Sequence, residues 1–196
     1  KLESGKVDLM GGIFAAASLY TGSFGSTNIW TQTATVNFGQ SFTARPIALK
    51  GFYKYTPNVI NLVKNVPAGV TIVKDQTLDQ CAIYIALAKK TYTIDNGNQS
   101  TFIDFKNDEN IIAYGELPSG AATEGDGYVE FNIPLKYKNL TDQPTHIIVV
   151  CSSSKYGDYM TGGIGQCAHI VQQVLRLGGQ LLGGHILCAY RSRFVA

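Results

Sequence analysis

The sequence predicts an all-β protein with the architecture of a jelly-roll-like β-sandwich. About eight or nine short apolar stretches recur at near-regular spacing, and turn-forming residues separate them. The composition of 21 glycines, 11 tyrosines and 9 phenylalanines favours strands joined by tight turns. No long amphipathic helical pattern occurs before Cys167. Together these observations favour packed sheets over a helical fold.

The longest predicted strand spans residues 45–57, RPIALKGFYKYTP, and the prediction of the fold is built around it. Pro46 cannot donate to a strand ladder and therefore suits the entrance. Alternation predicts one face made of Ile47, Leu49, Gly51, Tyr53 and Tyr55, and another made of Ala48, Lys50, Phe52 and Lys54. The first face changes from aliphatic to aromatic, so we expect one end to serve the core and the other a ligand. The alternative is that both tyrosines are core or rim residues.

Further strands are predicted wherever apolar residues alternate or run together between turns. The predicted ranges are 33–38, 69–74, 80–88, 101–105, 111–117, 128–137 and 145–151. Residues 11–20 fit a strand or a buried turn, and residues 21–28 have the composition of a loop. The predicted core contains Ile47, Leu49, Ile83, Ile85, Leu87, Phe131, Ile133, Ile148 and Val150.

Composition and charge give no support to several classes of function. The 196 residues suit one large β domain, and the net charge of +2 comes from scattered Lys and Arg, which does not favour nucleic-acid binding. No apolar run reaches the roughly 18 residues of a transmembrane helix. The four cysteines lack CxxC spacing, so we expect no metal site, and Cys81 and Cys151 fit buried apolar positions. No motif indicates a cofactor.

Residues 152–163, SSSKYGDYMTGG, form a polar and aromatic segment rich in glycine. Loops at the rim of a β-sandwich are where binding residues concentrate. The segment therefore fits a polar surface, edged by aromatic rings, that binds carbohydrate. It fits a structural turn equally well, because the serines and Asp158 can bond nearby backbone amides.

Two longer motifs carry a resemblance to a known family. The segments VNFGQSFTARPIALKGFYKYTP and IIVVCSSSKYGDYMTGG, together with DQCAIYIAL, IIAYGEL and YVEFNIPLKY, resemble the putative carbohydrate metabolism domain family of Bacteroidetes. The resemblance implies a jelly-roll domain similar to carbohydrate-binding modules. It also implies an exported protein at the cell surface or in the periplasm, often lipid-anchored through a preceding segment. It assigns no catalytic residue.

The resemblance divides the chain into a β-sandwich over residues 1–165 and an atypical tail over residues 166–196. Family members continue with a strand that ends in acidic residues and an aromatic, whereas this chain has no acidic residue after Asp158. Codons for residues 165–168, read one base later, can encode Gly-Ser-Val-Leu. We therefore hypothesise a reading-frame slip near Gly165 and expect a poorly integrated tail that leaves a sheet edge unpaired.

Two functions from different classes follow, and a third is weaker. The first is a non-catalytic carbohydrate-binding domain that captures glycans. The second is a structural or adhesive module that binds protein. A glycoside hydrolase is third, because it needs two carboxyls about 5–10 Å apart and no signature marks such a pair. The carboxylates available for one are Glu116, Glu124, Asp126, Glu130 and Asp158.

The residues expected to bind the ligand are mainly aromatic, because aromatic planes stack on the apolar faces of sugar rings while charged groups bind the hydroxyls. They are Trp30, Tyr53, Lys54, Tyr55, Lys155, Tyr156, Asp158 and Tyr159. The end of residues 45–57 and the start of residues 152–163 both change from apolar to aromatic and cationic residues where a strand gives way to a turn. We therefore expect the Tyr53–Tyr55 end of the long strand to lie beside residues 152–158.

Overall fold

The computed structural model describes residues 1–7, 13–28, 30–31, 33–171, 176–177, 180–181 and 188–190. Its strands are β1 (Leu2–Glu3), β2 (Gly5–Val7), β3 (Ile13–Ala15), β4 (Ser18–Tyr20), β5 (Gly22–Asn28), β6 (Thr33–Phe38), β7 (Gln40–Ser41), β8 (Ala48–Thr56), β9 (Ala82–Ala88), β10 (Tyr92–Asp95), β11 (Ile111–Glu116), β12 (Val129–Pro134), β13 (Lys136–Tyr137), β14 (His146–Ser152), β15 (Cys167–Val171), β16 (Arg176–Leu177), β17 (Gln180–Leu181) and β18 (Cys188–Tyr190). Two 3-10 turns are η1 (Gln99–Thr101) and η2 (Gly157–Tyr159).

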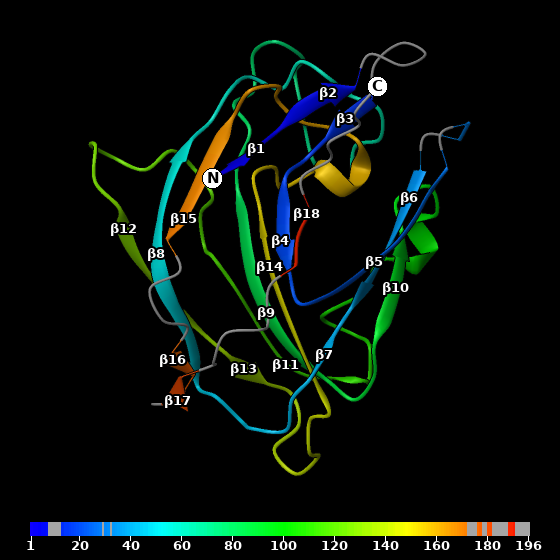
Figure 1. Cartoon of the computed structure of the whole chain (residues 1–196), viewed down its shortest axis with the longest axis vertical. Coiled ribbons are helices and arrows are strands. Elements are labelled where there is room, and N and C mark those ends of the chain that lie inside the picture. The colour runs from blue at the N-terminus through cyan, green and yellow to red at the C-terminus, as the bar shows by residue number, and fades with distance from the viewer. Residues whose placement is uncertain are drawn as a thin grey trace.

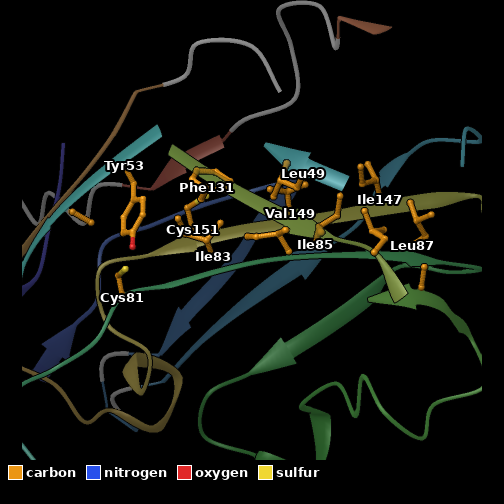
Figure 2. Packing of buried hydrophobic residues seen from close by; sticks show 14 of the residues in the cluster. Leu49, Tyr53, Cys81, Ile83, Ile85, Leu87, Phe131, Ile147, Val149 and Cys151 are labelled. Atoms are coloured by element: carbon orange, nitrogen blue, oxygen red, sulfur yellow. The ribbon is translucent and has the colours of Figure 1, made fainter. Parts of the chain in front are cut away.

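Two antiparallel sheets face each other and enclose the main core (Figure 1). One is a four-stranded sheet of order β1-β15-β8-β12, and the other is a seven-stranded sheet in which β9 lies between β11 and β14. Figure 2 shows Leu49, Tyr53 and Phe131 of the first sheet packed against residues of β9 and β14. Neighbouring strands come from distant parts of the chain, as in a jelly-roll-like sandwich. The predicted all-β sandwich is confirmed.

A second core lies on the opposite face of the seven-stranded sheet. A three-stranded sheet of order β10-β6-β5 contributes Phe38 and Ile94 to it, and β9 and β14 contribute Ala86 and Ile148. Several half-buried aromatic side chains pack along its border, namely Tyr84, Tyr92, Phe102, Phe105 and Tyr114. The seven-stranded sheet is therefore covered on both faces, which explains why residues 80–88 are almost continuously apolar.

The predicted long strand is confirmed as β8, with one correction at its start. Leu49, Tyr53 and Tyr55 are buried, while Phe52 on the opposite face is exposed. Ile47, however, is 75% exposed because it precedes the first residue of β8 and the alternation does not extend to it. The other predicted core residues are confirmed as buried: Leu49, Ile83, Ile85, Leu87, Phe131, Ile133, Ile148 and Val150.

Three other predictions of secondary structure were wrong. Residues 69–74 and residues 101–105 form no strand, and the second range begins at the end of η1. Residues 21–28, predicted to be a loop, contain β5, which pairs with β6. The register of that pair shifts between Phe24 and Thr27, so the glycines and serines accommodate an irregular strand.

The structure also moves the boundary that the sequence suggested at residue 165. Strand β15 pairs with β8 through Ala168↔Tyr55 and Ile170↔Tyr53, and Ala168 is buried. Strand β1 pairs with β15 in turn, so the N-terminal residues complete the same sheet. The four-stranded sheet therefore continues to Val171, and β18 (Cys188–Tyr190) joins the seven-stranded sheet through β4, so the strands do not end at residue 165. Poor integration of the tail stays a prediction. Most of the later tail lies outside the described residues.

Candidate functional site

The segment of residues 152–163, here called the rim loop, follows β14 directly and is held by backbone hydrogen bonds. The amide of Ser153 donates to Ala17 O over 2.9 Å, and that of Lys155 donates to Gln80 O over 2.7 Å. The turn η2 follows, and Met160 ends it in the left-handed region with a φ of 54°. The amide of Asn65 then donates to Tyr159 O over 3.2 Å. The loop is therefore fixed at several points along its length.

A buried carboxylate organises the base of the rim loop. Asp79 is 1% exposed, and its Oδ2 accepts hydrogen bonds from Ser154 Oγ at 2.7 Å, Gln166 Nε2 at 2.7 Å and the Gly163 amide at 3.0 Å. Its Oδ1 accepts from the Gln80 amide at 2.7 Å. Burial raises the pKa of Asp79, while these four donors oppose the rise. Asp79, in the segment just before β9, thus joins the two ends of the rim loop to each other.

Tyr53 and Tyr55 lie beside the rim loop, as predicted, but they do not form an open binding surface. Tyr55 is 1% exposed, and its hydroxyl donates to Ser153 O over 3.1 Å. Tyr53 is 9% exposed and points toward Cys81 in the main core (Figure 2). A ring buried on both faces cannot stack on a sugar, so the expected ligand-binding role of these two tyrosines is corrected to a structural one.

Lys54 and Trp30 do not meet the rim loop either. Lys54 lies on the outer face of β8, where its Nζ is 3.6 Å from Asp126 Oδ1 and donates to Asp126 O over 3.0 Å. Trp30 is 82% exposed in the connection between β5 and β6. The structure therefore does not gather the eight expected site residues into one place.

The other four expected residues, Lys155, Tyr156, Asp158 and Tyr159, all belong to the rim loop. Lys155 and Asp158 are exposed, while Tyr156 and Tyr159 are half-buried. The ring of Tyr159 meets that of Phe102 edge to face, with centroids 5.1 Å apart and an interplanar angle of 86°. This contact connects the rim loop to the segment that contains η1.

Tyr159 and Phe102 extend a group of rings on the outer face of β9 and β11. The ring of Phe105 stacks on Tyr114 with centroids 4.5 Å apart, and it meets Tyr84 edge to face at 5.3 Å. We call Tyr84, Phe102, Phe105, Tyr114 and Tyr159 the aromatic cluster. Each of these residues is partly buried.

Two carboxylates border the aromatic cluster. Glu116, directly opposite Tyr84 in the strand register, accepts a hydrogen bond from the Tyr114 hydroxyl at 2.9 Å. Asp158 is exposed and directly precedes Tyr159 in the rim loop, and its charge adds to the effect of burial in raising the pKa of Tyr84 and the pKa of Tyr159.

The sequence contains a signal for part of this cluster. In residues 80–88, Ile83, Ile85 and Leu87 fill the main core, which leaves Tyr84 alone among alanines on the other face. Tyr114 and Glu116 share that face of β11 at the same period of two. Phe102 and Phe105 could not be placed in this way, because their segment is not a strand.

The chemistry of the cluster suits recognition of a polar ligand that has apolar faces. Aromatic rings offer stacking surfaces, and carboxylate oxygens accept hydrogen bonds from hydroxyls. Among the residues that the structure describes, no group of three or more His, Cys, Asp or Glu side chains could hold a metal ion. In the same part of the chain, no helix has the length and apolar character needed to cross a bilayer.

Comparison with solved structures shows a shared fold. A putative glycoside hydrolase from Bacteroides thetaiotaomicron matches with a TM-score of 0.50 at 19% identity, over 86% of this chain and 54% of that protein. A putative glycoside hydrolase from Bacteroides vulgatus matches with a TM-score of 0.52 at 19% identity, over 86% of this chain and 74% of that protein. The chain thus spans about half the length of the first of these proteins.

Comparison with curated proteins found no match. The family model described as the putative carbohydrate metabolism domain matches residues 1–170, which is most of the chain and extends almost to the end of β15. The match confirms the resemblance inferred from the motifs, and the fold agrees with it. The chain belongs to the putative carbohydrate metabolism domain family.

Proposed function

We propose that this domain binds carbohydrate through the aromatic cluster and does not itself cleave the glycan. The observation that carries the proposal is the contact of Tyr159 with Phe102, which joins the rim loop to the rings on β9 and β11. It brings half-buried rings and two carboxylates, Asp158 and Glu116, to one surface. Sugar rings present apolar C–H faces and hydroxyl edges, and this combination of side chains complements both.

The preorganisation of the rim loop supports the same proposal. Asp79, Ser154 and Gly163 fix the ends of the loop through hydrogen bonds, so little conformational entropy remains to be lost when a ligand binds. Tyr156 O also accepts hydrogen bonds from the amides of Tyr159 and Thr161, at 3.0 and 3.2 Å. These contacts hold Asp158 and Tyr159 in place without using their side chains.

A glycan array tests the proposal, with saturable binding by the wild-type domain as the expected result. Tyr159→Ala should weaken binding of the best array ligand at least about tenfold, since it removes a stacking surface. Tyr159→Phe keeps the ring and should retain most of the affinity. Tyr128→Ala is the matched control, because Tyr128 is 47% exposed beside β12 on the other sheet.

The outcomes separate the proposal from the alternative of a protein-binding or structural module. A blank array with measurable affinity for a partner protein would favour that alternative. Equal loss of glycan binding in Tyr159→Ala and Tyr128→Ala would mean that the site lies elsewhere. Thermal unfolding of each variant distinguishes lost binding from lost folding.

Glycoside hydrolysis is a second candidate, favoured by one observation: Asp158 and Glu116 border the same cluster. Two carboxyls that flank a bound sugar are the minimal equipment of a glycosidase. Incubation of the array ligand with the wild-type domain should release no shorter products under our proposal. Product release that Glu116→Gln or Asp158→Asn abolishes would show hydrolysis instead.

The proposal extends to the location of the protein. The family resemblance supports an exported protein at the cell surface or in the periplasm. Fractionation of cells that express the full protein should recover it with the outer membrane or in the periplasm. Recovery in the cytosol alone would contradict this part of the proposal.

A further inference from the structure

The segment that supplies most of the aromatic cluster has an unbalanced charge. Residues 92–118 contain five carboxylates and one lysine, a net charge of −4, so the remainder of the chain carries +6. The five acidic residues are Asp95, Asp104, Asp108, Glu109 and Glu116. This segment also contains Phe102, Phe105 and Tyr114. Three of the five rings of the aromatic cluster therefore lie in the acidic segment of a chain that is basic elsewhere.

Carboxylates border the rings directly. Glu116 Oε2 accepts the Tyr114 hydroxyl at 2.9 Å, and the charge of Asp158 acts on Tyr84 and Tyr159 from the rim loop. Glu116 and Asp158 are exposed, so a ligand that stacks on the rings would meet both charges. They come from different elements: Glu116, on β11, lies opposite Tyr84 in the strand register, and Asp158, in η2, directly precedes Tyr159.

The nearby lysines face other groups. Lys138 Nζ donates to the carbonyls of Phe105, Lys106 and Asp108 at 3.1, 3.2 and 2.8 Å. Lys90 Nζ lies 5.0 Å from the centroid of Tyr92, and Lys64 Nζ contacts Met160 Sδ at 3.7 Å.

Two further exposed lysines belong to the same segments, Lys106 to the acidic segment and Lys155 to the rim loop. Lys155 is the cation closest in sequence to Asp158. The positive charge of Lys155 should therefore offset part of the negative charge of Asp158, and removing it should show how large that offset is.

We infer that the aromatic cluster discriminates by charge: it accepts neutral glycans, prefers glycans with free amino groups, and disfavours uronic-acid or sulfated glycans. The inference rests on the proposed function, because it concerns the same site. Exposed charges at hydrogen-bonding distance interact by an amount that corresponds to about a fivefold change in affinity for each pair. Salt should reduce the discrimination, since exposed charges are screened.

Three oligosaccharides with the same β-1,4-linked gluco backbone test the inference: cellohexaose, the glucosamine hexamer and the glucuronate hexamer. They are titrated at 20 mM and 500 mM salt, beside the glycan array. We expect the glucosamine hexamer to bind about fivefold more tightly than cellohexaose at low salt, and the glucuronate hexamer about fivefold more weakly. Both differences should shrink at high salt. On the array, acidic glycans should be depleted among the ligands.

Three variants identify the residues that cause the discrimination by charge. Glu116→Gln combined with Asp158→Asn should remove most of the difference in affinity among the three oligosaccharides, compared as ratios within each variant. Lys155→Gln should increase the preference for the amino sugar. Glu130→Gln is the control, because Glu130 is an exposed carboxylate on β12 of the other sheet.

The failures can be told apart. Acidic glycans that bind as tightly as neutral ones, or a double variant with unchanged discrimination, would overturn the charge inference and leave glycan binding intact. No binding to the three oligosaccharides together with a blank array would overturn the proposed function, and this inference with it.

Discussion

The hydroxyl of Tyr55 donates a hydrogen bond to the carbonyl oxygen of Ser153 over 3.1 Å, inside the protein. The contact joins the end of β8 to the start of the rim loop across 98 residues of sequence. It confirms that these two segments are neighbours, which the sequence predicted from their shared change of polarity. It also shows that the side chain of Tyr55 supports the rim loop from inside the protein and does not face a ligand.

Removal of this hydroxyl should destabilise the domain. Tyr55→Phe leaves the buried Ser153 carbonyl without its donor, at an expected cost of about 1–3 kcal/mol in the free energy of unfolding. Urea unfolding measures the cost. Tyr53→Phe is the control, since the ring packs against Phe131 at 6.0 Å and keeps that contact, and its cost should be smaller. Equal effects of the two substitutions would contradict the role given to the Tyr55–Ser153 bond.

The buried Asp79 should give the stability of the domain a specific pH dependence. Burial raises its pKa, so the folded protein holds the proton more tightly than the unfolded chain, whose Asp titrates near pH 4. The favourable contribution is therefore complete below about pH 4 and decreases as the pH rises through the pKa of the folded state. The free energy of unfolding of the wild type, minus that of Asp79→Asn, should decrease from about pH 4 to pH 7.

A difference in the free energy of unfolding that increases with pH would contradict this prediction. Asp79 receives four hydrogen-bond donors, and such donors favour the charged carboxylate. A difference that increases with pH would show that the donors outweigh burial. Circular dichroism at each pH would confirm that both proteins start from the same fold.

Substitutions at two residues that the sequence predicted for the core should distinguish the buried residue from the exposed one. Ile85→Ala removes a fully buried side chain and should cost about 2–5 kcal/mol. Ile47→Ala should change stability by less than about 0.5 kcal/mol, since Ile47 is 75% exposed. Chemical denaturation of both variants checks the correction, and a large cost at Ile47 would contradict it.

Truncation should test the part that β15 plays in the four-stranded sheet. Removal of all residues after Gly165 deletes β15, which exposes the edge of β8 and separates β1 from the sheet. Removal of residues after Val171 keeps both pairings and deletes β18 from its place beside β4. We expect the first truncation to lower the melting temperature far more than the second, and equal effects would contradict the part given to β15 in the four-stranded sheet. The reading-frame hypothesis stays a prediction that the coding DNA tests.

The sequence predicted the strands whose pattern comes from burial. In β8, β9 and β14, alternation or continuous apolar residues follow directly from one or two covered faces, and these strands form the core as expected. Ile47 failed because periodicity does not show where a strand begins. The pattern in residues 101–105 failed because local side-chain bonds compete with strand pairing. Asn98 Oδ1 accepts the Ser100 amide at 3.1 Å, and Thr101 Oγ1 donates to Asn98 O over 2.7 Å, which favours the turn η1.

The site was predicted only in part, for a related reason. The rim loop was identified from its composition, but the rings that face it come from β9, β11 and the η1 segment, and no local pattern shows that these meet Tyr159. Exposure was also misassigned: Tyr55 and Tyr159 have the same side chain, and only the packing around them makes one a core residue and the other a rim residue.

The most direct test of the central claim is to map the backbone amides of the ¹⁵N-labelled domain by NMR as the best array glycan is titrated in. Our account predicts saturable shifts concentrated in three separate stretches of sequence, around Phe102 and Phe105, around Tyr114 and Glu116, and around Asp158 and Tyr159. The Lys50 and Phe52 amides, on the sheet at the other side of the main core, should stay unchanged. Shifts concentrated on β8 and β12, with none at Tyr159, would contradict the claim that the aromatic cluster binds the glycan.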